Sequence, residues 1–376
     1  MAISKTIMIV IAAVAVLAVC VACVLIVNNH GNSGNDDGGD DDVIDFTLTD
    51  AVGREVNFKS YPTRALCTSA MEVESLIYMG LGDKVAAING DDTNYREYSD
   101  DITGVKSYGK GTIKNMSSLM TAVENGTVKL LDPTWRQTAE TLANNYQEGD
   151  LIIFGYTSYE KSSIGSQLDA LGLRYFVCPY ATSVQGVYDD IEVLGKIFGE
   201  ETTATKIVDN CKEVISKVKA LVSNYSAPSY AITMSKYAYG GGYILGAIAE
   251  ELGSKNAFGI TANYAQISAE DVIQGNPGAV LEASWGRQGE AVISNTDPLM
   301  ADLDFAKFDR YYTLSTNLSY KYGPSYRALT STSPHLVETY LMITLVLYGD
   351  QLGIEVPNHV FTDDYQTYLQ KIVDKF

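Results

Sequence analysis

The sequence of 376 residues has few of the side chains on which hydrolytic active sites depend. Its three histidines, His30, His335 and His359, lie far apart, so the chain has no His-x-x-x-His zinc pair. It also lacks the Gly-x-Ser-x-Gly motif, which would hold a nucleophilic serine on a sharp turn. These absences argue against zinc-dependent and serine hydrolases, and we expect neither an enzyme nor a resident cofactor or metal.

Cysteine is scarce as well, with five residues in the chain. Cys20 and Cys23 lie inside an apolar run, where a redox pair is not expected. Cys67, Cys178 and Cys211 are too scattered to indicate a disulfide framework. We therefore expect these three to be small buried hydrophobic side chains.

Positive charge is the third shortage. The chain carries 27 Lys and Arg against 46 Asp and Glu, which gives a net charge of −19. Such a charge repels phosphate backbones, so nucleic acid is not an expected partner. Tyrosine, in contrast, is abundant, with 26 residues. Its ring offers flat apolar area and its hydroxyl a hydrogen bond, a combination suited to a binding cleft.

Residues 1–27 contain an uncharged apolar run that begins after Lys5 and is long enough to span a bilayer. The run continues beyond Cys20 and Cys23, which favours a retained transmembrane anchor over a cleaved signal segment, with lipoprotein processing as an alternative. An acidic flexible linker follows over residues 28–43. With Lys5 inside and the acidic linker outside, we expect cell-membrane attachment with the rest of the chain outside the cytoplasm.

Residues 200–223 show the spacing of a long amphipathic helix without Pro or Gly. The expected apolar face consists of Ala204, Ile207, Val208, Cys211, Ile215, Val218 and Val222. Periodicity alone fits either a helix inside one α/β domain or a rod between two lobes. Its position near the middle of the chain favours the rod, with an N-terminal lobe over 44–199 and a C-terminal lobe over 224–376.

Short apolar runs alternate with helical patterns on both sides of this helix, which indicates parallel sheets covered by helices. The expected strands span residues 46–49, 54–58, 64–67, 84–88, 150–154, 175–178, 230–234, 279–282 and 311–314. The expected helices span residues 72–79, 164–171, 247–252 and 336–348. Ligands of open α/β sheets bind beyond the carboxyl ends of the strands, so two such sheets predict a cleft there.

Several short motifs follow one another along the chain after the linker. They are Thr49-Asp50-x-x-Gly53-Arg54, Pro62-x-Arg64, Glu74-x-x-Ile77-x-x-Gly80-Leu81-Gly82-Asp83, Leu194-Gly195-Lys196, Ile267-Ser268-x-Glu270 and Ser333-Pro334-His335-Leu336. In this order they resemble the substrate-binding proteins of ABC importers for siderophores, haem and cobalamin. The resemblance implies an α/β fold of two Rossmann-like lobes joined by one long α-helix, the class III periplasmic-binding-protein fold.

The sequence departs from that family at two places. The Pro-Asp pair usually found before the middle strand of each lobe is Gly149-Asp150 in the first and Pro277-Gly278 in the second. Residues 116–146 form a longer segment than the family pattern suggests, with Trp135 near an extra strand and helix. Ligand contacts in that segment cannot be transferred from the family.

The resemblance also implies how the protein meets its transporter. Glu74 and Glu270 occupy the positions whose carboxylates, one in each lobe, contact basic pockets of an ABC permease. Both residues also lie near predicted helix starts, where a carboxylate is favoured by the helix dipole alone. We expect a monomer that works with a permease and its ATPase.

Candidate ligand contacts follow the predicted strands at their carboxyl ends. They are Tyr95, Tyr156, Tyr180, Tyr237, Tyr239, Trp285, Arg287 and Arg327. The two arginines suit bidentate binding of carboxylates, and tyrosine suits Fe³⁺. Residues 240–242 are three glycines, which would let a bulky ligand approach the backbone.

These observations predict a membrane-anchored, extracytoplasmic binding protein that captures an iron(III)-siderophore-type metal chelate and delivers it to a permease. A corrinoid or haem is the alternative ligand within the same family. A surface enzyme or adhesin that reuses the fold is the alternative of another class, since fold alone does not determine function. Asparagine triplets of the glycosylation type at Asn115, Asn125, Asn224 and Asn317 are compatible with an external location.

Overall fold

The computed structural model describes residues 44–90, 108–132, 136–156, 159, 164–179, 182–283, 291–314, 333–362 and 364–376. The predicted anchor and linker lie outside this part of the chain. Within the described residues, no helix combines the length and the apolar character needed to cross a membrane. The chain divides into two compact units, residues 1–60 and residues 61–376.

The described part of the first unit is a hairpin formed by the first two predicted strands. Strands β1 (Phe46–Thr49) and β2 (Glu55–Phe58) pair antiparallel. The carboxylate of Asp50 accepts hydrogen bonds from the backbone N–H groups of Val52 and Arg54, at 3.1 and 2.9 Å. An aspartate bonded in this way to backbone amides ahead of it is a typical turn former.

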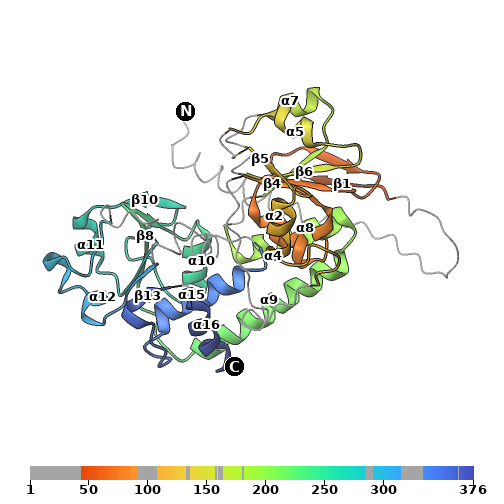
Figure 1. The fold of residues 1–376 in the computed structure, drawn as a ribbon. Helices are drawn as coiled ribbons and strands as arrows, with labels where there is room; N and C mark the ends of the chain where they lie inside the picture. Colours follow the sequence, from red (N-terminus) through yellow and green to blue (C-terminus); the bar gives the residue numbers. More distant parts are fainter. Residues whose placement is uncertain are drawn as a thin grey trace, which may run out of the picture. The chain divides into compact units, whose positions relative to one another are not determined.

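The second unit begins with a parallel sheet of five strands in the order β5-β4-β3-β6-β7. The strands are β3 (Ala65–Cys67), β4 (Val85–Asn89), β5 (Lys129–Leu131), β6 (Leu151–Gly155) and β7 (Tyr175–Cys178). The helices are α2 (Ala70–Tyr78), α4 (Met116–Glu124), α5 (Ala139–Asn145), α7 (Gly165–Ala170) and α8 (Val184–Phe198), with the short helix η1 (Gly82–Lys84). Strands β3, β6 and β7 are buried along their whole length, as expected of parallel strands covered on both faces. Figure 1 shows β4 and β6 with α2 and α8 on one side and α5 and α7 on the other.

Helix α9 (Glu201–Val222) confirms the predicted long helix to within one residue at each end. Each residue of the expected apolar face is buried, together with Val214. This face packs against α8 and against α15 (Leu336–Tyr348), the helix predicted near the end of the chain. Because residues 61–376 form one compact unit, the division into lobes at residues 199 and 224 stays a prediction.

A second sheet follows α9, with six strands in the order β10-β9-β8-β11-β12-β13. The strands are β8 (Tyr230–Met234), β9 (Tyr237–Tyr239), β10 (Tyr264–Gln266), β11 (Ala279–Glu282), β12 (Tyr311–Leu314) and β13 (Val360–Phe361). Strands β8, β11, β12 and β13 are parallel, whereas β9 and β10 add an antiparallel edge that the sequence did not predict. The turn from β8 to β9 places Ser235 at a φ of +56°, which lets the chain reverse within two residues.

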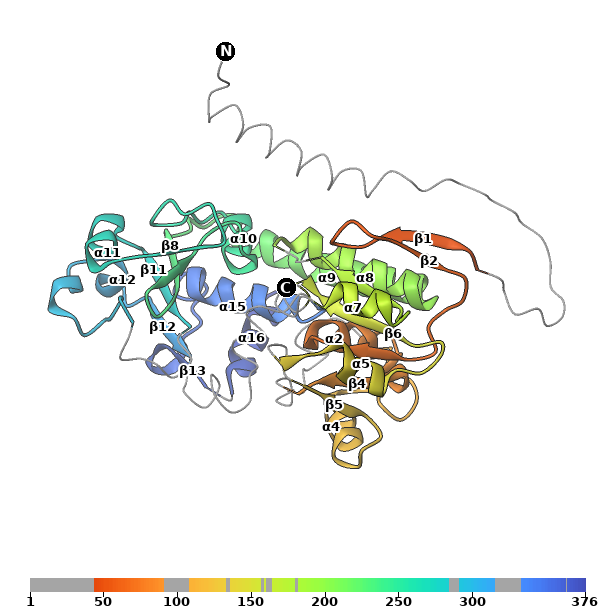
Figure 2. The ribbon, with the colours of Figure 1, turned by 90° about the horizontal axis from the view of Figure 1, so that it is seen from above.

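Helices cover both faces of this second sheet. Figure 2 shows α11 (Ala269–Gly275) and α12 (Asp304–Lys307) on one face and α10 (Ile244–Glu251) and α15 on the other. The remaining helices are α16 (Tyr365–Val373) and the short helices η4 (Pro298–Met300) and η5 (Pro357–His359). Every residue of α15 is buried, which matches its continuous apolar sequence. The α/β class predicted from the sequence is therefore confirmed.

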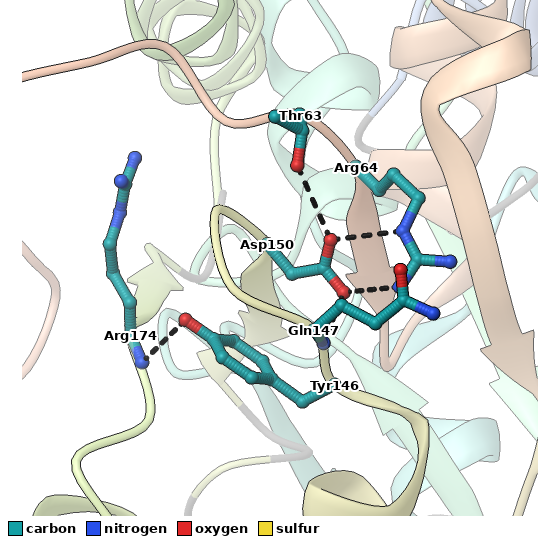
Figure 3. Close-up of polar contacts among 6 residues, drawn as sticks. All are labelled: Thr63, Arg64, Tyr146, Gln147, Asp150 and Arg174. Carbon is teal, nitrogen blue, oxygen red and sulfur yellow. Dashed lines mark hydrogen bonds and ion pairs between the residues drawn. The ribbon is translucent and has the colours of Figure 1, made fainter.

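An ion pair between the partly exposed Arg64 and the buried Asp150 connects β3 to β6 at their amino ends (Figure 3). Arg64 donates from Nε and Nη2 to the two carboxylate oxygens of Asp150, at 3.0 and 2.6 Å. The backbone N–H of Gln147 donates to the same carboxylate at 2.8 Å. The side chain of Asp150 is fully buried, so these donors replace the water that the carboxylate loses. This cluster explains the Pro62-x-Arg64 motif as a structural feature, at the opposite edge of the sheet from the expected ligand site.

Candidate functional site

Each of the two sheets of residues 61–376 contains one point where the strand order reverses. In the first sheet, β4 and β5 lie on one side of β3, and β6 and β7 lie on the other. In the second sheet, β9 and β10 lie on one side of β8, and β11, β12 and β13 lie on the other side of β8. Ligands of open α/β sheets bind at the carboxyl ends of the strands at such a switch point. The candidate site therefore lies at the ends of β3 and β6 and of β8 and β11.

A buried glutamate occupies the switch point of the first sheet. Ser69 follows β3, and its hydroxyl donates a short hydrogen bond to the carboxylate of Glu72 in the first turn of α2. Gly155 ends β6 beside them, and a Cβ at that position would lie 3.1 Å from the Ser69 hydroxyl and 3.3 Å from Glu72 Oε1. A larger residue at Gly155 would therefore crowd this pair.

The protonation of Glu72 follows from its surroundings. Burial raises the pKa of Glu72 to about 7, and the Ser69 hydrogen bond opposes this shift. Burial also raises the pKa of Asp190 on α8 well above its usual range, and the charge of Glu72 adds to that effect. Asp190 Oδ1 is buried, and none of the described residues forms a hydrogen bond with it. The two carboxyl groups thus favour binding of a proton at neutral pH.

A second buried glutamate lies at the switch point of the second sheet. Glu282 is the last residue of β11, is 2% exposed, and pairs in register with Thr233 of β8 and Thr313 of β12. Thr233 Oγ1 donates to Glu282 Oε2 at 2.5 Å, and the backbone N–H of Ser235 points to Oε1 at 3.4 Å. Strand pairing and the hydroxyl bond together fix this carboxylate at the edge where ligands are expected.

A cavity of about 380 Å³ opens beside Glu282. Its lining includes Glu282, Tyr311, Thr313, Ser294 and Asn358, so it combines one carboxylate with hydroxyl and amide groups. The Tyr311 hydroxyl donates to the backbone oxygen of Ile293 at 2.9 Å, which connects β12 to the cavity wall. Its volume lies within the range of small-molecule pockets.

The structure brings together two of the predicted ligand tyrosines. Tyr237 and Tyr239 both lie on β9, the strand that pairs with β8 next to the switch point of the second sheet. The ring of Tyr239 is buried and stacks on Tyr243 with centroids 4.6 Å apart. Tyr237 is half-buried, and its ring meets that of Tyr264, which is 59% exposed, edge to face at 5.7 Å. Tyr237 is thus the more accessible of the two predicted residues.

Residues 240–242 require a correction. A Cβ at Gly240 would lie 2.3 Å from the backbone oxygen of Ile260, and one at Gly241 would lie 2.5 Å from the Glu250 carboxylate. The backbone carbon of Ala262 is 2.9 Å from the corresponding point at Gly242. The three glycines are needed because the chain's own segments pack against them, so the interpretation that they admit a ligand was wrong.

The other predicted ligand residues have different outcomes. Tyr156 is half-buried and directly follows Gly155, next to the Glu72 switch point. Tyr95, Tyr180, Trp285, Arg287 and Arg327 lie outside the described residues, as does Trp135. The 116–146 segment, for which one extra strand and one helix were predicted, contains the strand β5 and the two helices α4 and α5. Sequence analysis overlooked Glu72 and Glu282, although a glutamate ending the apolar run of residues 279–281 is a recognisable signal.

Only one of the two proposed docking carboxylates is exposed. Glu270 lies on the surface in the first turn of α11, where Ser268 and Asp271 form the capping box. The side chain of Glu74 is buried and accepts a hydrogen bond from Ser333 Oγ at 2.6 Å. The expectation of an accessible Glu74 is therefore corrected, because the segment before α15 covers it.

Among the residues that the structure describes, no three His, Cys, Asp or Glu side chains are grouped closely enough to hold a metal ion. Cys67, Cys178 and Cys211 are buried, as predicted. Burial raises the pKa of the Cys67 thiol well above its usual value, so that thiol stays protonated.

No family model matches the chain. A search of curated proteins finds a relative in Bacillus subtilis (strain 168), described as the uncharacterized ABC transporter substrate-binding lipoprotein YvrC. The two sequences are 23% identical over 292 residues, which cover 75% of this chain and 82% of the relative.

Solved structures share the fold. The TroA-like periplasmic binding protein FepB from Veillonella parvula is 16% identical, with a TM-score of 0.58 over 88% of this chain and 95% of that protein. An ABC-type Fe³⁺-hydroxamate transport system protein from Saccharomonospora viridis is 18% identical, with a TM-score of 0.55 over 80% of this chain and 98% of that protein. Other neighbours are described as haem-binding and vitamin B12-binding proteins. The relative is described as a substrate-binding protein of an ABC transporter, in agreement with the predicted class, and the solved structures agree with the predicted fold.

Proposed function

We propose that the chain, which belongs to the substrate-binding proteins of ABC importers, captures an Fe³⁺-siderophore-type chelate outside the cytoplasm and delivers it to a permease. The observation that carries this proposal is the switch point of the second sheet, where the Glu282 carboxylate lines a cavity of about 380 Å³. The related fold of an Fe³⁺-hydroxamate transport protein supports the choice of ligand class.

The chemistry of the described site suits a chelate. A chelated metal ion brings its own ligands, so its carrier needs hydrogen bonds and aromatic surface around the chelate. Glu282 and Thr313 offer the polar groups, and Tyr237 on the neighbouring strand β9 offers a half-buried ring. Tyrosine combines apolar area with a hydroxyl, which fits the mixed surface of such a ligand.

A corrinoid or haem is the second candidate, because structural neighbours are described as vitamin B12- and haem-binding proteins. A direct test is native mass spectrometry of the full-length protein in detergent. The protein is mixed in turn with an Fe³⁺ trihydroxamate, an Fe³⁺ triscatecholate, haem and cobalamin. Retention of an Fe³⁺ chelate alone supports the first ligand class, and retention of haem or cobalamin alone supports the second. Retention of none contradicts the proposal, and the same spectra test the expected monomer.

Attachment to the membrane is the second part of the proposal. The apolar run within residues 1–27 would hold the protein at the cell membrane, with a permease and ATPase as partners. The relative is described as a lipoprotein, which keeps lipid attachment at Cys20 or Cys23 as the alternative. Intact-mass measurement of the protein extracted from membranes separates the two, because the retained segment adds its full peptide mass and lipid processing removes the residues before the modified cysteine.

A further inference from the structure

We infer that Asn125 is a glycosylation site and that the sugar chain attached to it covers the edge strand β5. The inference goes beyond ligand capture, and it rests on the proposed function in one respect, the location outside the cytoplasm. Asn115, Asn125, Asn224 and Asn317 each begin an Asn-x-Ser or Asn-x-Thr triplet, the acceptor motif of N-linked glycosylation. Asn317 lies outside the described residues, and the structure gives the other three different environments.

Asn125 lies in an exposed turn between α4 and β5, and all three residues of its triplet are exposed. Its Oδ1 atom accepts hydrogen bonds from the Thr127 hydroxyl at 2.6 Å and from the Thr127 backbone N–H at 3.0 Å. Both bonds use Oδ1, whereas the amide nitrogen Nδ2 is the atom that would carry the sugar. The turn therefore holds the asparagine at the surface beside the hydroxyl that the motif requires.

The middle residue of the triplet leaves room for a transferase. Gly126 has a φ of +77°, a left-handed conformation that glycine adopts without strain. A Cβ at this position would meet only Lys129 Nζ within 4 Å, at 3.7 Å. A transferase must hold the triplet in its own active site, and a turn with so few close neighbours is readily approached.

Asn115 is less suited to modification. It is half-buried and is the N-cap of α4, where its Oδ1 accepts from the Ser118 backbone N–H at 3.0 Å. The hydroxyl residue of its triplet, Ser117, is already part of the helix. Binding of this triplet by a transferase would disrupt the cap that stabilises the start of α4.

Asn224 begins the third described triplet, in the exposed turn after α9. This triplet ends at Ser226, whose backbone oxygen accepts a hydrogen bond from Gln351 Nε2 at 3.1 Å. The contact ties the triplet to the segment that follows α15. The turn before β5 is therefore the exposed triplet whose hydroxyl contacts its own asparagine, and it is the acceptor that the geometry favours.

The position of Asn125 gives the sugar chain a structural role. Strand β5 stands at the end of the first sheet, and among the described strands it pairs with β4 alone. Leu130 in this strand is 49% exposed. An uncovered edge strand can pair with another chain, and proteins reduce that risk by covering the edge. A hydrophilic sugar chain on the turn just before β5 would shield this edge.

The reaction needs a donor of one chemical class, a lipid-linked sugar that is activated as a phosphate ester and used by a membrane-bound transferase. Nδ2 of Asn125 forms a bond to the anomeric carbon of the first sugar, and the bond from that carbon to the phosphate oxygen breaks. The lipid phosphate leaves with the bonding electron pair, and a base of the transferase takes one proton from Nδ2. The side chain remains an amide, so Oδ1 keeps its hydrogen bonds with Thr127.

Mass spectrometry of the protein extracted with detergent from its own cell membrane tests this inference. Trypsin releases residues 115–129 as one peptide, which contains both Asn115 and Asn125. Fragmentation by electron transfer keeps sugars on their side chains and identifies the modified residue. We expect a sugar chain on Asn125 and none on Asn115. An unmodified Asn125, or a sugar chain on Asn115 in its place, would overturn the inference.

Variants produced in the same cells test the role of the hydroxyl. Asn125→Gln and Thr127→Ala should each lower the intact mass by the mass of the sugar chain, whereas Thr127→Ser should keep it. Asn115→Asp is the matched control, because aspartate also caps a helix, and its mass should change by the substitution alone. Comparison between variants cancels any processing at the N-terminus. A sugar chain retained in Thr127→Ala would contradict the assignment.

Sedimentation velocity tests the shielding of β5. Asn125→Gln should self-associate more than the unaltered protein, and the additional change Leu130→Lys should reverse this, because a charge on an edge strand opposes pairing. Identical sedimentation of the unaltered protein and Asn125→Gln would overturn the shielding role.

Two further measurements separate failure of this inference from failure of the proposed function. The turn before β5 lies at the amino ends of the parallel strands, away from the expected ligand edge, so an Fe³⁺ trihydroxamate should bind equally to the unaltered protein and to Asn125→Gln in calorimetric titration. A labelling reagent that cannot cross the membrane reports, on intact cells, whether the chain lies outside. If Asn125 is unmodified in a labelled, chelate-binding protein, this inference alone fails. If the chain is neither modified nor labelled, the proposed location fails with it.

Discussion

The hydroxyl of Ser333 donates a hydrogen bond of 2.6 Å to the carboxylate of Glu74, a residue 259 positions earlier in the chain. Both residues are buried. His335 Nε2 lies 3.8 Å from the same carboxylate, and burial holds the pKa of His335 well below its usual value, which keeps the ring neutral. The segment before α15 is thus tied to α2 by hydrogen bonding to a buried carboxylate.

Removal of this hydrogen bond should destabilise the protein. Ser333→Ala leaves the buried Glu74 carboxylate with one donor fewer, which should lower the free energy of unfolding by about 2 kcal/mol. Urea unfolding followed by circular dichroism measures the change. Ser226→Ala, at an exposed position, is the control and should have no clear effect. Equal unfolding midpoints for the two variants would show that this bond adds nothing to stability.

The stability of the protein should fall as the pH rises from about 4.5 to about 7. The pKa of Glu72 is about 7 in the folded protein, compared with 4.5 for an ordinary glutamate. Between these values the folded state holds a proton that the unfolded state has lost, so each increase in pH favours unfolding. The protonated Glu72 contributes about 3 kcal/mol to the free energy of unfolding. This contribution is fully present below pH 4.5 and is lost as the pH rises through about 7.

Urea unfolding of the unaltered protein and of Glu72→Gln at intervals from pH 4.5 to 8 measures this dependence. The variant cannot ionise at position 72, so its stability should vary less with pH. Burial is the main cause of the raised pKa of Asp190, and the variant removes only the smaller contribution that the Glu72 charge makes to it. Glu140→Gln, at an exposed position on α5, should keep the slope of the unaltered protein. If the unfolding free energy of Glu72→Gln changed with pH as steeply as that of the unaltered protein, Glu72 would not be the group that causes the pH dependence.

The Arg64–Asp150 pair should matter for stability and not for ligand binding. Asp150→Asn removes the charge that Arg64 and the backbone of Gln147 bind, which should cost about 2–3 kcal/mol of unfolding free energy. Ligand affinity should remain, because the pair lies at the amino ends of β3 and β6. Thermal melting and chelate titration measure the two properties, with the exposed Asp302→Asn as control. A selective loss of affinity with normal melting would contradict this role.

Glu270 should matter for transport and not for capture. Its carboxylate is exposed, and the capping box of α11 is formed by other residues. Glu270→Lys should therefore abolish uptake into proteoliposomes that contain the permease and ATPase, while chelate affinity stays unchanged. Loss of the favourable dipole interaction should cost less than about 1 kcal/mol of stability. The exposed Glu355→Lys is the charge-matched control, and normal uptake by Glu270→Lys would show that the docking assignment is wrong.

The sequence by itself determined the local elements. Strands 175–178, 230–234, 279–282 and 311–314 and the helix 336–348 were predicted at the bounds that the structure gives. The reason is that hydrophobic periodicity directly reports which residues face a core, and buried parallel strands and amphipathic helices have distinct periods. The ordered motifs likewise predicted the family, because they depend on residue types and spacing alone.

Tertiary structure decided the environment of individual polar residues. The local sequence places Glu74 near a helix start, where a docking carboxylate would be accessible, but the structure buries it and pairs it with Ser333 from a distant part of the chain. The glycines of residues 240–242 suggest an opening for a ligand, yet Glu250 and residues 260–263 fill that space. Glu282 lines a cavity because β8 and β12 lie on either side of it and a later segment closes the wall. Burial and hydrogen bonding of a side chain depend on segments that are distant in sequence, and the local pattern does not contain that information.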